Sequence, residues 1–284
     1  MRFEDLKDKA VEHLGIEVTT VNWFSTYRVH HRVAEHFRKS RAFILGDAAH
    51  IHSPAGGQGM NTGIGDAINL AWKLKAVLSG GVRDAEAKER LLSSFEEERI
   101  AFARKLVRTT DQAFSLATSD GRIAQFVRTR LVPLVMPLAA GLEPIREFMF
   151  RTVSQIMINY RGDYLSVGEA GQVHGGDRLP WLDAGDGRSN YDAFNRLCWQ
   201  VHVYGYAGYA LEDWCSKNAI PLQAYPWQPA CEDAGFARDA VYLLRPDSYV
   251  AAAFHATSLE AIERYFDDHG INLPMTASTA AYSA

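Results

Sequence analysis

The sequence predicts an α/β protein with two structural units, and three observations support this prediction. The first is a short apolar run, Arg41 to Leu45, which ends in Gly46-Asp47 and has the pattern of a buried strand before a tight turn. The second is a pair of long helical stretches that follow it. The third is an alternation of strand-like and helical segments beyond residue 200. A chain of 284 residues can hold two modest domains.

Composition and charge exclude several classes of protein. Hydrophobic residues make up 47% and charged residues 23%, which is typical of a globular protein with a real core. A net charge of −4 argues against binding to nucleic acid or to an anionic membrane. No apolar run resembles a secretory signal or a membrane span, so we expect a cytoplasmic location. The cysteines Cys198, Cys215 and Cys231 are far apart and are expected to be free thiols.

A glycine-rich segment precedes the first long helix. Residues 56–65 read GGQGMNTGIG, and the following residues have the spacing of one apolar helical face. We expect this face to contain Ile64, Ala67, Ile68, Ala71, Leu74 and Leu78. Asn61 or Thr62 is the predicted cap, and Gly80-Gly81 is the predicted stop. A strand pair is expected earlier, over residues 16–30, and a second helix later, from about Ala85 to Leu116.

The rest of the chain divides into a helical part and a strand-rich part. Prolines between residues 131 and 157 predict short or kinked helices. Strands are then expected at 201–203, 222–225, 241–244 and 249–254, and helices at 207–217 and 259–269. We interpret the tryptophans of this part, Trp199, Trp214 and Trp227, as core or interface residues.

The glycine-rich segment also predicts a chemistry. A glycine-dense loop at the start of a helix presents bare backbone N–H groups together with the positive end of the helix dipole. Such a point stabilises negative charge, for example the N1 and C2 carbonyl edge of a reduced flavin ring. Asp47, directly after a strand and a glycine, is placed to accept hydrogen bonds from sugar-like hydroxyl groups.

These residues carry a family resemblance. The run from Arg41 through His50, Ser53-Pro54 and GGQGMNTGIGDAINLAWKL closely resembles the second flavin motif of FAD-dependent aromatic-ring hydroxylases of the phenol hydroxylase and para-hydroxybenzoate hydroxylase type. The resemblance implies that Gly46 and Asp47 bind the ribityl chain and that Pro54 lies beside the flavin ring. It further implies that the segment Gly57, Gln58, Gly59, Met60 and Asn61 contacts the pyrimidine edge of the ring.

Weaker resemblances follow downstream. The segment Phe95 to Arg99 is similar to the helix of this family that ends in Glu-Arg, and Tyr160 to Ser166 is similar to its join to the next domain. The runs GDRLP at 176–180 and LLRPD at 243–247 resemble the thioredoxin-like carboxyl-terminal domain of the phenol hydroxylase branch. Because this part contains no C-x-x-C pair, the implied role is structural or at a dimer interface.

The resemblance is incomplete in one respect. A full member begins with a strand, a G-x-G-x-x-G turn and a later acidic residue, which bind the ADP half of FAD, and this sequence lacks them. The chain is therefore expected to begin inside the substrate domain. The implied segments are 1–40 as a remnant of the substrate-domain sheet, 41–165 as the carboxyl-terminal part of the FAD-binding domain with a helical extension, 166–274 as the thioredoxin-like domain and 275–284 as a tail.

The implied function is an FAD-dependent monooxygenase that hydroxylates a small aromatic substrate with NAD(P)H and dioxygen, active only if the missing region comes from a longer chain or a partner. The same residues leave two alternatives open: a non-catalytic association module, which could form a homodimer, and a stand-alone thioredoxin-like binding module. No catalytic base or substrate-binding residue can be named. His50 and His52 offer too few ligands for a metal site. Glu98 and Arg99 are expected to make structural polar contacts.

Overall fold

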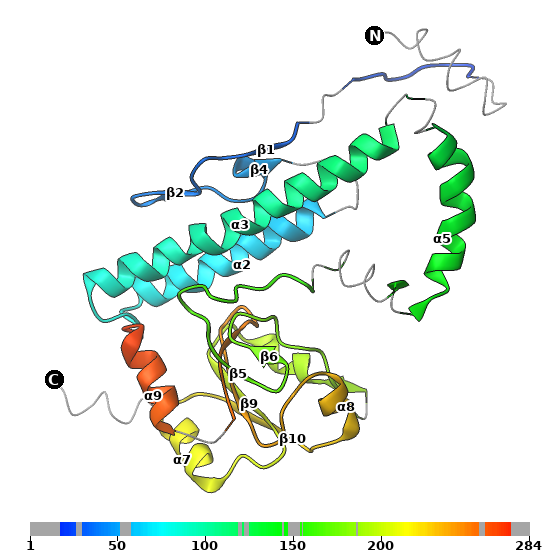
Figure 1. Ribbon diagram of the computed structural model, residues 1–284. Coiled ribbons are helices and arrows are strands. Elements are labelled where there is room, and N and C mark those ends of the chain that lie inside the picture. Colours follow the sequence, from blue (N-terminus) through cyan, green and yellow to red (C-terminus); the bar gives the residue numbers. More distant parts are fainter. Residues whose placement is uncertain are drawn as a thin grey trace.

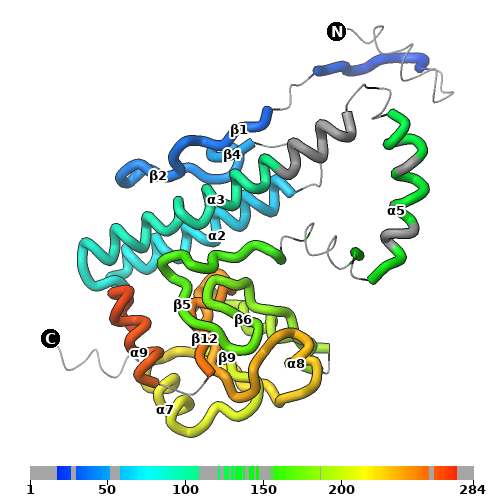
Figure 2. Tube along the Cα trace, viewed as in Figure 1, coloured from blue at the N-terminus to red at the C-terminus, as the bar shows by residue number. Residues whose placement is uncertain are grey.

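The computed structural model of the chain is shown as a ribbon in Figure 1 and as a tube in Figure 2. It describes residues 18–26, 30–51, 58–118, 121, 125–143, 145–146, 154, 156–185, 187–255 and 259–273. Within this part, short strands and two long helices form one region, and a mixed sheet with its own helices forms another. The described part therefore mixes helices and sheet, as the sequence predicts.

The first region begins with two small antiparallel strand pairs. Strand β1 (Arg32–Val33) pairs with β4 (His50–Ile51), and β2 (Arg38–Lys39) pairs with β3 (Ala42–Phe43). The turn between β3 and β4 is the 3-10 helix η3 (Gly46–Ala48). The predicted tight turn is confirmed. The run from residue 41 to 45 contains only a two-residue strand, because one short neighbour pairs with it, and Phe43, Ile44 and Leu45 are half-buried against the core of the first region.

The strand pair predicted over residues 16–30 is wrong for the described part of that range. Residues 18–26 and 30 carry no strand. Alternating β-branched and aromatic residues fit a pleated surface, but a strand also needs a neighbour that completes its hydrogen-bond ladder. No described segment pairs with residues 18–26, so the pattern alone does not produce a sheet.

Two long helices, α2 (Gly59–Leu78) and α3 (Ala85–Thr118), run side by side in opposite directions and make up the centre of the first region (Figures 1 and 2). The predicted stop is confirmed: α2 ends at Leu78, and Gly80 follows with a φ of 77°. The predicted cap is wrong, since Asn61 and Thr62 lie inside the helix. Gln58 holds the N-cap position and makes no side-chain cap hydrogen bond.

The apolar face predicted for α2 is wrong for five of its six residues, whereas Leu74 is half-buried against the core of the first region. Ile64 is 51% exposed, Ile68 38% and Leu78 82%, and Ala67 and Ala71 are exposed as well. The face that α2 buries is mostly polar. Its buried residues are Thr62, Asp66, Asn69, Leu70, Trp72 and Lys73. Hydrophobic periodicity selected the opposite side, because the buried polar side chains find charged partners on α3 and beyond.

A proline-containing stretch links the two regions. The π-helical turn η4 (Val127–Leu131) leads into α5 (Val132–Ala140), which contains Pro137, and the chain turns at Gly141. The prediction of short, interrupted helices is therefore confirmed over the described residues.

The second region is built on a six-stranded mixed sheet with the order β10-β9-β11-β12-β5-β6. Its strands are β5 (Val167–Ala170), β6 (Val173–His174), β9 (Gln200–Tyr204), β10 (Leu222–Tyr225), β11 (Val241–Leu244) and β12 (Val250–Phe254). The β9–β10 and β12–β5 pairs are parallel, and the other pairs are antiparallel. A small hairpin, β7 (Asp183–Gly185) and β8 (Arg188–Ser189), precedes the 3-10 helix η5 (Asn190–Asn195).

Three helices accompany this sheet: α7 (Tyr209–Lys217), α8 (Pro229–Asp233) and α9 (Leu259–Asp268). The predicted strands and helices of this region are all confirmed to within a few residues. Trp199 and Trp214 lie in its core and Trp227 packs against it, as expected. The thiols of Cys198, Cys215 and Cys231 are free, and the last two are buried. None of the helices among the described residues combines the length and apolarity needed to cross a membrane.

Candidate functional site

The predicted ribityl-binding residues lie on the surface turn η3. Gly46 has a φ of 56°, a left-handed conformation that a side chain would strain. Asp47 follows it with an exposed side chain. The turn is closed by a hydrogen bond of 2.8 Å from the Ala49 N–H to the Gly46 carbonyl. Asp47 therefore points its carboxylate to the outside from a fixed backbone.

The predicted ring-contacting residues are described only in part. Pro54 and Gly57 lie outside the described residues, as does His52. Gln58 is 8% exposed, whereas Met60 is 76% exposed. With Gly59 and Asn61 they form the first turn of α2, where backbone N–H groups have no acceptor within the helix. This end of the helix therefore carries the positive end of the helix dipole, which favours an electron-rich group.

The turn and the start of α2 are brought together by two glycines. A Cβ built on Gly63 would lie 3.3 Å from the Gly46 Cα, and one built on Gly46 would lie 3.8 Å from the Gly63 Cα. Only residues without side chains allow this approach without displacement. Gly46 and Asp47 therefore lie next to the helix start that carries Gln58 to Asn61, although the two segments are separated in the sequence.

A buried carboxylate, which the sequence did not predict, lies directly beneath the turn. Asp66 on α2 is 1% exposed. It accepts hydrogen bonds from the Gly46 N–H at 3.0 Å and from Arg99 Nε at 2.6 Å, and His50 Nε2 lies 2.8 Å from its Oδ2. Burial alone would raise the pKa of Asp66, but the hydrogen bond with His50 and the charge of Arg99 lower it. Asp66 is held as an anion inside the protein.

Arg99 extends this network from α3 to the start of the second region. Its Nη1 donates to the Tyr160 hydroxyl at 2.8 Å, and its Nη2 donates to the Thr62 carbonyl at 3.3 Å. The Tyr160 ring lies 4.3 Å from the ring of Tyr249, and the Ser166 hydroxyl donates to the Tyr160 carbonyl at 2.7 Å. The expectation that Arg99 makes structural polar contacts is confirmed.

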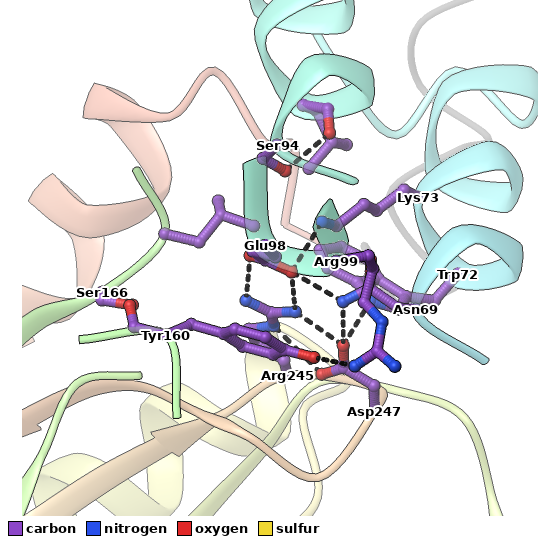
Figure 3. Close-up of polar contacts among 12 residues, drawn as sticks. Asn69, Trp72, Lys73, Ser94, Glu98, Arg99, Tyr160, Ser166, Arg245 and Asp247 are labelled. Atoms are coloured by element: carbon purple, nitrogen blue, oxygen red, sulfur yellow. Dashed lines mark hydrogen bonds and ion pairs between the residues drawn. The ribbon is translucent and has the colours of Figure 1, made fainter. Parts of the chain in front are cut away.

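A second buried network joins the two helices to the sheet (Figure 3). Glu98 on α3 accepts from Lys73 Nζ at 2.9 Å and from both terminal nitrogens of Arg245 at 2.7 and 3.0 Å. Arg245 also donates to Asp247, at 3.0 and 2.6 Å. Asp247 accepts in addition from the Trp72 indole at 2.9 Å. The positive charges of Lys73 and Arg245 are therefore matched in number by the negative charges of Glu98 and Asp247 in the protein interior.

The pKa values in this second network follow from its geometry. Burial alone would raise the pKa of Glu98, but Arg245 and Lys73 lower it to about 2. Burial lowers the pKa of Lys73 to about 8, against the attraction of Glu98. Glu98 is therefore a carboxylate at neutral pH, and its charge holds Lys73 and Arg245 in place.

The residues that sequence reasoning missed share one signal. Thr62, Asp66, Asn69 and Lys73 recur at steps of three or four along α2, which is the spacing of one helical face. Counting polar residues in this way would have located the buried network. Among the described residues, no group of three His, Cys, Asp or Glu side chains is arranged to hold a metal ion.

Comparisons with known proteins agree with the flavin interpretation. Residues 3–110 match the family model of an FAD binding domain. A flavin-dependent monooxygenase of Mycobacteroides abscessus is 30% identical over 254 residues, which is 88% of this chain and 45% of that protein. The chain is thus similar to an FAD binding domain over residues 3–110 and to a monooxygenase that depends on flavin.

Solved structures of a flavin-containing enzyme and of an aromatic hydroxylase have a similar fold. CabE, an aromatic hydroxylase from angucycline biosynthesis, superposes with a TM-score of 0.68 and 26% identity over 94% of this chain and 53% of that one. The rebeccamycin biosynthetic enzyme RebC with reduced flavin superposes with a TM-score of 0.64 and 27% identity, over 85% of this chain and 47% of that one. The chain thus spans about half the length of these proteins.

Proposed function

We propose that this chain provides the flavin-facing part of an FAD-dependent monooxygenase that hydroxylates small aromatic or phenolic substrates with NAD(P)H and dioxygen. One observation carries the proposal: the exposed Asp47 and the first turn of α2 lie side by side, fixed by the contact of Gly46 with Gly63. A cytoplasmic location, where NAD(P)H is available, is part of the proposal.

The residues present fit a flavin. The Asp47 carboxylate would accept hydrogen bonds from ribityl hydroxyl groups, while the left-handed Gly46 keeps the backbone close to that chain. The backbone of Gln58 to Asn61, at the positive end of the α2 dipole, would face the electron-rich ring edge. The family resemblance adds Gly57 to this segment and Pro54 beside the ring, and both lie outside the described residues. When bound, the flavin would carry electrons from NAD(P)H to dioxygen and one oxygen atom to the substrate.

The proposal includes a second polypeptide segment. The sequence has no G-x-G-x-x-G turn for the ADP half of FAD, and the proteins it matches are about twice as long. We therefore expect full hydroxylase activity only when the dinucleotide-binding half is supplied, in a longer chain or by a partner. No described residue is assigned as the general base.

We also propose that residues 166–274 form a thioredoxin-like domain with a structural role, which includes a homodimer interface. The order β10-β9-β11-β12, with α7 between β9 and β10, α8 before β11 and α9 after β12, supports this assignment. The buried contacts argue against an independent binding module. Arg245 and Asp247 would lose Glu98 and Trp72 if the first region were removed, and unpaired buried charges are strongly destabilising.

Flavin binding by the purified chain tests the proposed function. Riboflavin contains the ring and the ribityl chain without the ADP half, so it needs only the residues present here. We expect riboflavin fluorescence to be quenched on titration with the chain, and Asp47→Ala to weaken binding about tenfold, since a hydrogen bond to a charged group contributes about 1.5–3 kcal/mol. Asp268→Ala is the matched control, because Asp268 is also an exposed carboxylate and lies at the end of α9.

The outcomes separate the hypotheses. Quenching that is lost in Asp47→Ala and kept in Asp268→Ala supports the proposal. A chain that binds neither riboflavin nor FAD overturns it and favours the association module. Consumption of NADPH with phenol, after addition of a polypeptide that carries the dinucleotide-binding half, then tests the hydroxylation step.

A further inference from the structure

The carboxylate of Asp66 connects segments that the sequence keeps apart. It contacts the backbone of η3 through Gly46, the side chain of His50 on β4, and the guanidinium of Arg99 on α3. Asp66 itself lies on α2, one turn after Gly63. A single buried group therefore links the turn, the strand that follows it and both long helices.

The turn depends on this link. The η3 helix is three residues long, and the residue at its N-cap, Leu45, provides no side-chain cap hydrogen bond. The Gly46 N–H, which would otherwise lack a helical acceptor, is instead satisfied by Asp66 Oδ2. Because the same oxygen lies 2.8 Å from His50 Nε2, it fixes the two ends of the segment that carries Asp47.

We infer that Asp66 is a positioning residue, which orients the Gly46–Asp47 turn relative to the first turn of α2 so that both face the same ligand. The inference rests on the proposed function, because the ligand is a flavin. Asp66 is too deeply buried, at 1% exposure, to touch the ligand itself. Its effect passes through the Gly46 N–H and the glycine contact with Gly63.

The test compares Asp66→Asn with Leu70→Ala. Leu70 lies one turn further along α2, is 5% exposed and packs in the core of the first region, but its apolar side chain cannot hydrogen-bond to the turn. Both substitutions should lower the urea concentration at the midpoint of unfolding. Only Asp66→Asn should raise the riboflavin dissociation constant, by about tenfold, and speed hydrogen exchange of the Gly46 amide by a similar factor.

A second variant keeps the inference testable if Asp66→Asn does not fold. Gly63→Ala retains every charge but places a methyl group 3.3 Å from the Gly46 Cα, so the turn must shift by a few tenths of an ångström. We expect weaker riboflavin binding with little loss of stability.

Two results would overturn the inference. One is an unchanged riboflavin dissociation constant in Asp66→Asn or Gly63→Ala under conditions where the variant is folded. The other is an equal loss of binding in Leu70→Ala, which would show a general effect of stability. Failure of the unsubstituted chain to bind riboflavin would instead refute the proposed function. Exchange of the Gly46 amide in the absence of ligand would still decide whether Asp66 holds the turn.

Discussion

The two regions of this molecule bury opposite kinds of surface. Between α2 and α3 the interior contains Asp66, Lys73, Glu98 and Arg99, all below 3% exposure. In the second region, the central strand β11 (Val241–Leu244) is fully buried and entirely hydrophobic or aromatic. The difference teaches that the helix pair combines an apolar core with directed charge contacts, whereas the centre of the sheet is held by buried area and packing. These two forces respond differently to mutation and to pH.

The largest expected effect comes from unbalancing the charges. Glu98→Gln leaves Lys73 and Arg245 with Asp247 as their remaining anion, so we expect the free energy of unfolding to fall by about 3–5 kcal/mol. Urea unfolding followed by circular dichroism measures this change.

The double variant Glu98→Gln with Lys73→Met is the control for this prediction. It restores equal numbers of buried cations and anions, so it should be more stable than the sum of the two single changes by at least about 1 kcal/mol. Strict additivity of the two single effects would mean that the charges act independently and that balance is unimportant.

In the sheet, the substitution comparable to removing a buried charge is one that shortens a buried apolar side chain. Leu243 on β11 is fully buried between the other core residues of this region. We expect Leu243→Ala to lower the free energy of unfolding by roughly 3 kcal/mol, from lost burial and the cavity left behind. Val167→Ala on β5 is the control, since Val167 is 39% exposed and should cost less than about 1 kcal/mol. An equal loss of unfolding free energy in the two variants would show that core packing is not the main source of stability in the sheet.

The same contrast explains what could be predicted from the sequence. Strands such as β9 and β11 were predicted because their apolar, β-branched residues are buried for the reason that the pattern assumes. The face of α2 was predicted incorrectly, because distant partners decide what it buries: Lys73 pairs with Glu98, and the Trp72 indole donates to Asp247, 175 positions away. The buried polar residues of α2 do recur at helical spacing, but this spacing does not identify the distant residues that pair with them.

The candidate site was predictable to a similar degree. The Gly46–Asp47 turn and the glycine-rich helix start were identified from residues next to each other in the sequence, and their placement side by side agrees with that interpretation. The support beneath them, Asp66 with His50 and Arg99, was not identified. It depends on contacts among three elements, and no local pattern specifies those contacts.

The sheet region should also respond to pH through one histidine. His202 on β9 is buried between aromatic rings, with Phe194 stacked at 5.7 Å, and its Nδ1 has no hydrogen-bond partner among the described residues. Burial lowers its pKa from 6.5 to about 3. Unfolded His202 takes up a proton below about pH 6.5, whereas the folded residue stays neutral. The unfolding free energy should therefore fall as the pH drops from 6.5 towards 3, by at most about 1.4 kcal/mol per pH unit.

The variant His202→Phe should flatten this pH dependence, because it keeps the stacking on Phe194 and removes the titrating group. Unfolding free energies at pH 7, 6, 5 and 4 measure the slope. His255→Asn, at an exposed position, should leave the slope unchanged. A slope that is identical in all three proteins would assign the acid sensitivity to carboxylates instead.

The smallest change in stability is expected for a substitution on the exposed side of α2. This substitution tests directly whether the face predicted to be buried is in fact exposed. Ile64 is apolar and lies at a position that periodicity assigns to the core, yet 51% of it is exposed. Ile64→Ala should therefore change the free energy of unfolding of this chain by no more than about 0.5 kcal/mol. Leu70→Ala, on the buried side of the same helix, should cost about 2–5 kcal/mol. If Ile64→Ala were as costly as Leu70→Ala, the apolar face would be buried after all. The charged network would then have to lie on the outside of α2.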